Sequence, residues 1–180
     1  MTGWAVRREE NEMSQVALTM VVLVFPILTI WAAVTDFMSM TIANRISLGL
    51  AAAGLLALLL GAPSWEAFGG HLAAAGLVFA VGFACFAMGW MGGGDVKFAT
   101  AVALWLGWGH LLDYAVTFSV FGGLLTLLAL FSDRVLDPLP ALKVGFLARF
   151  QEHRRVPYGV ALSAAALQIF PDTVWMRVFA

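Results

Sequence analysis

Two aspartates, Asp36 and Asp95, stand at positions from which a carboxyl group could do acid–base chemistry. Asp95 follows three consecutive glycines and directly precedes a new apolar run, and Asp36 ends the first long apolar run of the chain. A charged side chain among apolar segments costs free energy unless it has water, a partner or a catalytic role. For Asp95 the alternative is structural, with the side chain only capping the helix that follows.

The chemistry open to two such carboxyl groups is that of an aspartic protease. Two carboxyl groups within hydrogen-bond distance cannot both ionise easily, so they share a proton. The ionised group activates a water as general base, and the protonated group polarises a peptide carbonyl and later protonates the leaving amine. This chemistry needs no metal and no cofactor. Spacing alone leaves the pairing of Asp36 with Asp95 as one hypothesis beside the structural one.

The rest of the chain predicts an all-α membrane protein that would position these acids. Of its 180 residues, 62% are hydrophobic and 12% are charged, with a mean hydropathy of +0.90. Several apolar runs approach or exceed the ~20 residues that a helix needs to cross a bilayer. We expect one domain over residues 1–180, with a polar tail or short surface helix at 1–13 and an amphipathic connection at 133–156. The six expected transmembrane helices are 16–34, 46–60, 68–90, 96–109, 111–131 and 157–170.

Basic residues in the connections predict the orientation of these helices. All Lys and Arg residues of the connections fall in the first, third and fifth, and none falls in the second or fourth. They are Arg45, Lys97, Arg134, Lys143, Arg149, Arg154 and Arg155. The positive-inside rule places these connections on the cytoplasmic side and both termini outside. Arg7, Arg8 and Arg177, in the terminal segments, oppose this orientation.

The fourth expected span, 96–109, is short. From Asp95 to Gly109 a helix rises only about 22 Å, against a hydrocarbon core of ~30 Å. Trp105 and Trp108 are suited to the outer membrane interface, which would hold Asp95 below the cytoplasmic membrane surface. A carboxylate and irregular glycine backbone at that depth require a water-filled cavity or a protein partner.

The segment around Asp95 resembles the defining motif of type IV prepilin peptidases, which are intramembrane aspartyl proteases of the GxGD class. Gly92, Gly94 and Asp95 fit G-x-G-D, and Lys97 extends the match to the longer G-x-G-D-x-K form. A lone GxGD would be a weaker signal than the longer form together with other segments of the family.

Two further segments resemble the same family and occur in its order. Residues 36–44 resemble its first motif, in which an aspartate at a helix end is followed by a few residues and then Ile-Pro-Asn. Residues 157–161, which begin Pro157-Tyr158-Gly159, resemble a signature at the start of the last helix. The likeness covers about residues 30–169, and the short chain is similar to the peptidases that serve tight-adherence (Flp-type) pili.

The resemblance implies that Asp36 and Asp95 are the catalytic pair of an aspartic endopeptidase with the GxGD protease fold. It implies that the enzyme cuts the leader from prepilins or pseudopilins at the cytoplasmic face of the bacterial inner membrane, without a cofactor or metal. Ala43 stands where the family usually has Pro, and residues 37–41 lack the basic residues often found there. These departures concern substrate detail and leave both acids in place.

Five other residues of the three segments are candidates for supporting roles. Lys97 could act on the acids or contact substrate, or it could be an interfacial lysine that snorkels to the membrane surface. Asn44 is expected to cap the second span, with a hydrogen bond near the acids as the alternative. Tyr158 is interpreted as an interfacial aromatic anchor, with a place in the lining of the site as the alternative. Pro157 and Gly159 begin the last helix as part of its signature.

Composition weighs against several other partners and sites. The net charge is −1 and no basic patch indicates nucleic acid binding. Cys85 is the only cysteine, which excludes an intrachain disulfide, and the scattered His71, His110 and His153 do not predict a metal site. The mixture of apolar and basic residues at 133–156 predicts contact with membrane lipid. The sequence makes no prediction of the oligomeric state.

Two functions from other classes are also compatible with acids at membrane depth. A small transporter or ion pathway would place acids there too, but transporters more often show inverted repeats and matched interrupted helices, and we find no repeat. A non-catalytic membrane assembly factor of the same fold would tolerate the loss of either aspartate. Leader peptidase activity is the function that the three motifs favour.

Overall fold

The computed structural model describes residues 3–61, 64–130 and 156–179, and the regular secondary structure of this part of the chain is all helix, with no strand. The α-helices are α1 (Gly3–Ser39), α2 (Asn44–Gly61), α3 (Trp65–Ala87), α4 (Gly93–Leu106), α5 (Leu111–Leu130) and α9 (Tyr158–Ile169). Shorter 3-10 helices are η1 (Trp108–His110), η3 (Phe170–Asp172) and η4 (Val174–Phe179). The predicted all-α class is confirmed. The connection predicted at 133–156 lies outside the described residues except for its last residue.

Among the described residues, four helices are long and apolar enough to cross a membrane. They cover Ser14–Ser39, Asn44–Gly61, Trp65–Ala87 and Trp108–Leu128. Helices α4 and α9 have 14 and 12 residues, fewer than the ~20 of a typical span. The six spans expected from the sequence thus correspond to six α-helices among the described residues, of which four have the length and composition of a span.

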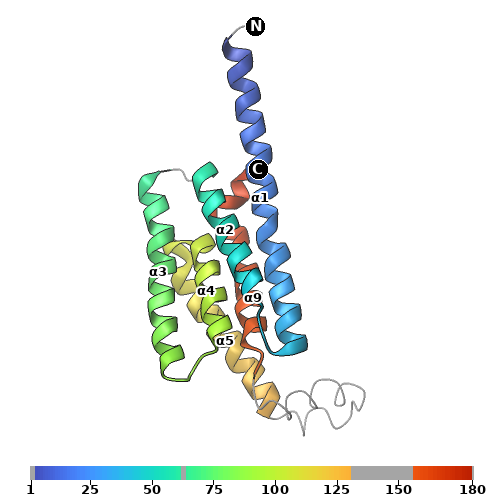
Figure 1. Ribbon diagram of the computed structural model, residues 1–180, viewed down its shortest axis with the longest axis vertical. Helices are drawn as coiled ribbons and strands as arrows, with labels where there is room; N and C mark the ends of the chain where they lie inside the picture. Colours follow the sequence, from blue (N-terminus) through green and yellow to red (C-terminus); the bar gives the residue numbers. More distant parts are fainter. Residues whose placement is uncertain (1–2, 62–63, 131–155, 180) are drawn as a thin grey trace.

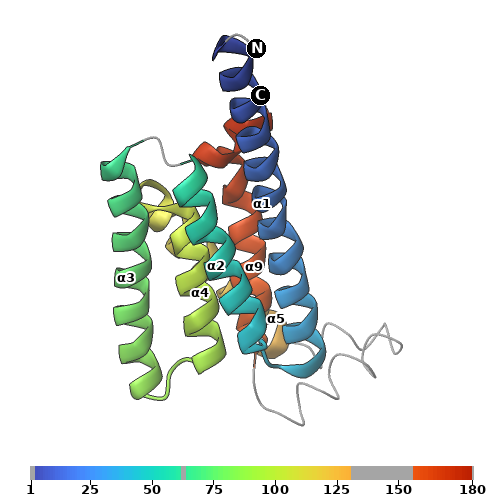
Figure 2. The same ribbon diagram turned by 45° about the horizontal axis from the view of Figure 1, so that its top comes forward.

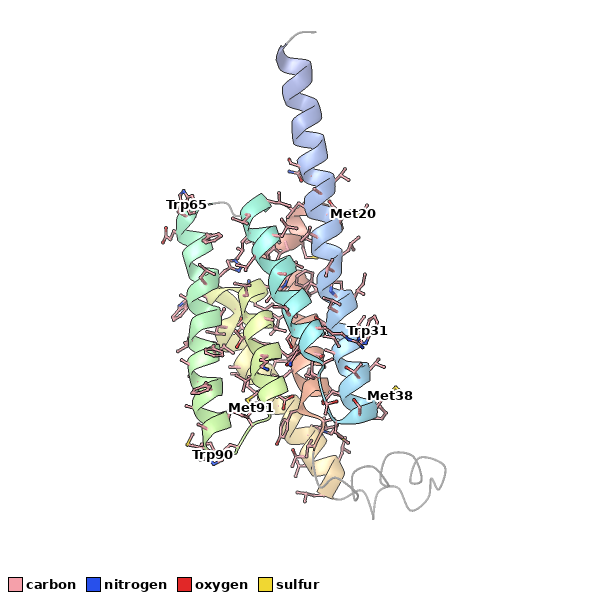
Figure 3. All side chains as sticks on the ribbon, viewed as in Figure 1. Met20, Trp31, Met38, Trp65, Trp90 and Met91 are labelled. Atoms are coloured by element: carbon pink, nitrogen blue, oxygen red, sulfur yellow. The ribbon has the colours of Figure 1, made fainter. Side chains whose placement is uncertain are left out.

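Exposed tryptophans mark the two ends of α3. Trp65 and Trp90 are strongly exposed and lie at opposite ends of this helix (Figure 3). With 23 residues, α3 is about 34 Å long, which matches a hydrocarbon core of ~30 Å. Tryptophan favours the membrane–water interface, so α3 has the features of a complete span.

Helix α1 is longer than the span expected at 16–34. It begins at Gly3, so residues 3–13 continue the first helix beyond the bundle instead of forming a separate tail (Figure 2). Residues 3–13 contain no signal that would end a helix. This stretch holds helix-favouring Glu and Arg, and the proline inside α1 is Pro26, well beyond it. At its other end α1 continues to Ser39, which places Asp36 on the last turn of the helix and not in the connection.

Helix α4 lies inside the bundle and packs against α2, α3 and α9 (Figure 1). It ends at Leu106, because Gly107 has a φ of 73° in the left-handed region that favours glycine. The fourth span was predicted to end at residue 109, so this predicted boundary was wrong by three residues. The turn packs beside α3, where a Cβ on Gly107 would lie 2.8 Å from the ring of His71.

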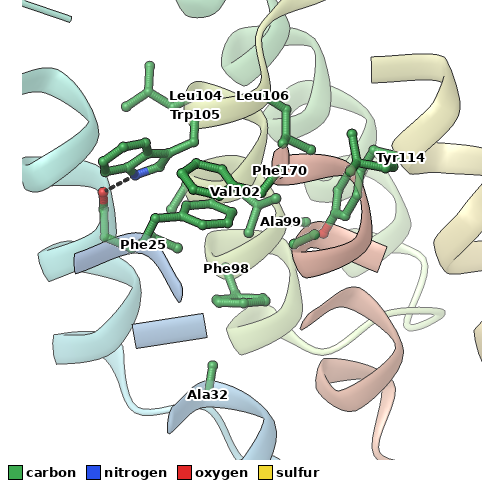
Figure 4. Packing of buried hydrophobic residues seen from close by; sticks show 14 of the residues in the cluster. Phe25, Ala32, Phe98, Ala99, Val102, Leu104, Trp105, Leu106, Tyr114 and Phe170 are labelled. Atoms are coloured by element: carbon green, nitrogen blue, oxygen red, sulfur yellow. Dashed lines mark hydrogen bonds between the residues drawn. The ribbon is translucent and has the colours of Figure 1, made fainter. Parts of the chain in front are cut away.

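Trp105 is in the core, so its predicted place at the membrane interface was wrong. The side chain is fully buried, and its indole N–H donates to the Leu50 carbonyl at 2.8 Å (Figure 4). The Trp175 indole N–H donates in turn to the Trp105 carbonyl at 2.7 Å. Phe25 stacks on Phe170 with ring centroids 4.1 Å apart, next to the Trp105 ring. These contacts join α1, α2, α4 and the C-terminal 3-10 helices, and they fix the short α4 in the centre. Trp108 is exposed, as expected of an interfacial residue.

The connections that carry the motifs share one end of the bundle. The α1–α2 connection, the α3–α4 connection and the start of α9 lie together at the lower end in Figure 1. The beginning of α1 and η4 lie at the other end. Segments far apart in the sequence therefore meet at the end where Asp36 and Asp95 are found.

Candidate active site

Asp36 and Asp95 line one cavity, of about 580 Å³, at this end of the bundle. The two carboxyl groups are close enough for their charges to interact. The cavity is lined by Asp36, Met40, Phe86, Gly89, Trp90, Met91, Gly92, Gly93, Asp95, Val156 and Tyr158. The structure thus brings together the two acids that the sequence places 59 residues apart.

Asp36 is placed by the way α1 ends. Met40 has a φ of 53°, a left-handed conformation that a residue with a side chain adopts at a cost. Its N–H donates to the Asp36 carbonyl at 2.8 Å and closes the last turn of the helix. Strained backbone of this kind is frequent beside functional sites. Met40 also lines the cavity, and sequence reasoning did not single it out.

The Asp36 side chain is buried, with 4% of its surface exposed, against the first turn of α9. The Val160 N–H donates to Asp36 Oδ2 at 3.3 Å, and the Gly159 backbone also hydrogen-bonds this carboxyl group. Pro157, at the N-cap of α9, makes no side-chain cap hydrogen bond. Asp36 therefore supplies from another helix the acceptor that the first N–H groups of α9 need, at the end of the helix dipole that favours an anion.

Gly159 is needed for this close approach. A Cβ at this position would lie 2.7 Å from both Asp36 Oδ2 and the end of the Ile42 side chain. Real Cβ atoms essentially never come so close to another heavy atom. The Tyr-Gly pair at 158–159 was noted from its sequence signature, but the contact of Gly159 and Val160 with Asp36 could not be derived from it.

Asp95 occupies the third residue of α4 and not its N-cap, which is Gly92. Its carboxyl group accepts a hydrogen bond from the Gly92 backbone, as the third residue of a capping box does. The N-cap role considered for Asp95 was therefore wrong, since the side chain hydrogen-bonds the backbone of the N-cap residue from the third position of the helix, and it also lines the cavity. This hydrogen bond and the place in the cavity lining are compatible because a carboxylate has more than one acceptor site.

The glycines before Asp95 permit close contacts as well as a turn. A Cβ on Gly92 would lie 2.9 Å from Asp95 Oδ2, so a larger residue would displace the carboxyl group. A Cβ on Gly94 would lie 3.4 Å from the Ile42 carbonyl, which belongs to the connection after Asp36. The missing side chain thus leaves room for the Asp95 carboxyl group at Gly92, and at Gly94 it lets α4 approach that connection.

Lys97 and Asn44 join the two motif segments directly. Lys97 Nζ donates to Asn44 Oδ1 at 2.9 Å, at an exposed position. Asn44 is the first residue of α2 and therefore follows the N-cap position, so the expected capping role was wrong and the hydrogen bond near the acids is the observed one. Because Asn44 begins α2 and Lys97 is the fifth residue of α4, this hydrogen bond connects the starts of the two helices.

Tyr158 lines the cavity and packs on α5. Its ring lies against Gly122, where a Cβ would approach to 3.2 Å, and its hydroxyl lies 3.4 Å from Thr126 Oγ1. The side chain is also 43% exposed. Both interpretations of Tyr158 from the sequence, the aromatic anchor and the lining residue, are therefore compatible with its place.

A second cavity, of about 480 Å³, adjoins the first and is almost entirely apolar. The two cavities share Trp90, Met91 and Tyr158. From there the second cavity extends between α3 and α5, with Val96 and Ala99 of α4 also in its lining. An apolar space thus leads away from the two carboxyl groups.

Among the described residues, no group of three or more His, Cys, Asp or Glu side chains could hold a metal ion. His71 is buried, and its Nδ1 is hydrogen-bonded to the Leu104 carbonyl at 2.8 Å. This contact gives the histidine a structural role beneath the α4–α5 turn. The residues that converge on the cavity can bind a water between two carboxyl groups and exchange protons with it.

A comparison with protein families matches residues 23–129 to the type IV leader peptidase family. The matched region includes Asp36, Asp95 and the glycine run, and it ends before the segment at 157–161. A search of curated proteins and a search of solved structures each gave no match. Because the family match covers more than half of the chain and includes both acids, the chain belongs to the type IV leader peptidase family.

Proposed function

We propose that this protein is a membrane-embedded aspartic endopeptidase that removes the leader from type IV prepilins, of the Flp type, with Asp36 and Asp95 as its catalytic pair. The observation that carries the proposal is the shared cavity, in which both carboxyl groups interact at one end of the bundle. Membership of the leader peptidase family supplies the class of reaction, which is proteolysis.

The proposed mechanism uses one proton shared by the two carboxyl groups. The ionised carboxylate takes a proton from a water as the water oxygen attacks the scissile carbonyl carbon. The protonated carboxyl group donates its proton to the carbonyl oxygen, which gives a neutral tetrahedral intermediate. The protonated carboxyl group of the pair then gives its proton to the amide nitrogen as the C–N bond breaks, while the other carboxylate takes a proton from a hydroxyl of the intermediate, so the pair is again singly protonated. The proton belongs to the pair, so we assign no fixed role to either residue.

The two adjoining cavities suggest how substrate lies at the site. The aspartate cavity opens at the end of the bundle, and the apolar cavity continues from Trp90 and Met91 toward the middle of α3. A peptide bond held at the carboxyl groups would therefore have a polar segment on one side and an apolar segment on the other. A precursor cut at the boundary between a polar leader and an apolar helix has this form.

The membrane placement completes the proposal. We place the motif-bearing end at the cytoplasmic face of the bacterial inner membrane, because the first, third and fifth connections of the sequence carry the basic residues. The short helices α4 and α9 would be the fourth and sixth passes of a six-helix GxGD protease. Burial of α4 against other helices supports this, since a short helix with a carboxylate is tolerated where protein and a cavity surround it.

The test is cleavage by the purified protein in lipid nanodiscs. A panel of Flp-type prepilins should be cut once, between leader and apolar segment, and mass spectrometry of the products would locate the cut. Cleavage should persist in EDTA, since the mechanism uses no metal. No cleavage of any precursor, or loss of activity in EDTA that a metal restores, would contradict the proposal. A transporter would instead move ions across sealed vesicles without cutting any precursor.

A further inference from the structure

Three side chains form the boundary between the aspartate cavity and the apolar cavity. Trp90, Met91 and Tyr158 line both cavities, whereas each of the other described lining residues belongs to only one. Trp90 and Met91 lie in the α3–α4 connection (Figure 3), and Tyr158 begins α9. A peptide that extends from one cavity into the other therefore contacts these side chains.

Met91 lies next to the backbone that holds Asp95. It directly precedes Gly92, and the Gly92 backbone hydrogen-bonds the Asp95 carboxyl group. Consecutive Cα atoms are about 3.8 Å apart, so the Met91 side chain starts one residue away from that hydrogen bond. Met91 is only partly exposed and packs against the core cluster. Its position relative to Asp95 is therefore fixed by the chain.

Tyr158 is placed in the same way relative to Asp36. It directly precedes Gly159, whose backbone hydrogen-bonds the Asp36 carboxyl group. Its ring lies against Gly122 of α5, where an added Cβ would approach it to 3.2 Å. Thr126 Oγ1 donates to the Gly122 carbonyl at 2.7 Å, so in its 3.4 Å contact with Tyr158 the tyrosine O–H is the donor. Helix α5 thus holds the ring at the boundary.

We propose that Met91 and Tyr158 are specificity-determining residues, which select the peptide bond that is cut because the apolar segment of the precursor begins at their side chains. They contact the substrate and exchange no proton with it. The inference rests on the proposed function, in which the two cavities hold the polar and the apolar part of one precursor, and it adds how the position of the cut is chosen.

The difference between the two cavities provides the selection. The apolar cavity offers almost no polar partner, so a charged segment would lose its hydration there without compensation, while an apolar segment gains by burial. The junction between the two parts of a precursor is therefore most stable at the boundary. An extended peptide advances about 3.3 Å per residue, so a slip of one residue brings a different peptide bond to the acids.

The test measures the position of the cut by mass spectrometry of both products, with the full chain in lipid nanodiscs. The unaltered protein should cut a Flp-type precursor at one bond. In Tyr158→Ala and in Met91→Ala, the share of product cut at an adjacent bond should rise about 10-fold or more, which is the order of discrimination that one apolar contact supplies. Met91 lies in a connection between helices, so Met91→Ala decides the outcome if Tyr158→Ala does not fold.

Phe118→Ala and Leu77→Ala are the matched controls. Both residues line the apolar cavity and not the aspartate cavity, so their truncation enlarges the apolar cavity away from the boundary. Each control should raise KM, because apolar contact with the substrate is lost, and each should leave the cut at the same bond.

A single, unchanged cut in a folded Tyr158→Ala or Met91→Ala variant would overturn the proposal, whatever change in KM accompanies it. Equal slippage in either control would overturn it as well, since the boundary would then not be the cause. Failure of the proposed function would give a different result, because the unaltered protein would then cut no precursor.

Discussion

The Asp36 carboxylate accepts the backbone N–H of Val160 at 3.3 Å, so an acid of the first helix binds the first turn of α9. The two residues lie 124 positions apart in the chain. This contact makes the start of α9 part of the site, although its residues carry no acid or base of their own. It also predicts which substitutions near the aspartates matter.

Gly159→Ala should reduce cleavage by at least roughly 10-fold and destabilise the protein by about 1–3 kcal/mol. The added Cβ would lie 2.7 Å from Asp36 Oδ2, so either the carboxyl group or the start of α9 must move. Cleavage rate and thermal unfolding of the purified variant measure the two effects. Gly123→Ala is the control, because a Cβ there meets nothing within 4 Å and alanine favours the helix. Equal losses in both variants would show that the Asp36 contact is not the cause.

The hydrogen bond between Lys97 and Asn44 should be energetically coupled to catalysis. Lys97→Met and Asn44→Ala should each slow cleavage several-fold, because each loosens the start of α2 from α4. The bond is exposed, so its effect on the free energy of unfolding should stay within about 1 kcal/mol. A double-mutant cycle on the cleavage rate is the measurement. The double variant should be no slower than the worse single variant, whereas multiplicative losses would mean that the two residues act independently.

The orientation predicts that the C-terminus lies outside the cytoplasm. η4 lies at the end of the bundle opposite the motif segments, while Arg45 and Lys97 belong to the first turns of α2 and α4, which begin at the aspartate end. A reporter that works only in the cytoplasm should be inactive when fused after Ala180. The same reporter inserted in the connection at 133–156 should be active. The reverse pattern would invert the proposed topology.

The aspartates and their motifs could be predicted from the sequence because their signals are local. A carboxylate after a glycine run in an apolar chain is unusual by itself, and the order of the three segments adds to it. The helical class followed from the apolar runs. In the structure both aspartates line one cavity and Asp95 lies in the first turn of α4, whereas the role of the two acids as a pair stays a prediction.

Other features depend on partners that are distant in the sequence. A tryptophan near the end of an apolar run suits an interface or a core, and only the contacts of Trp105 with Leu50 and Trp175 decide between them. Asn44 is a residue typical of helix caps, and its hydrogen bond with Lys97, which is distant in the sequence, becomes apparent only in the structure. The N–H of Val160 has no signature in the sequence, because every residue except proline carries the same donor.

The central claim is that Asp36 and Asp95 act as one catalytic pair, and substitution of each by asparagine tests it most directly. Asparagine keeps the size of the side chain but cannot serve as a base, so Asp36→Asn and Asp95→Asn should each reduce precursor cleavage by about 10²–10⁴-fold or more. Asp113→Asn, in the first turn of α5, is the control and should cleave normally. The measurement is the rate of leader removal at equal amounts of folded protein in the membrane. Loss in both variants with a normal control is the predicted result, and near-normal cleavage by either Asp36→Asn or Asp95→Asn would contradict the paired-aspartate mechanism.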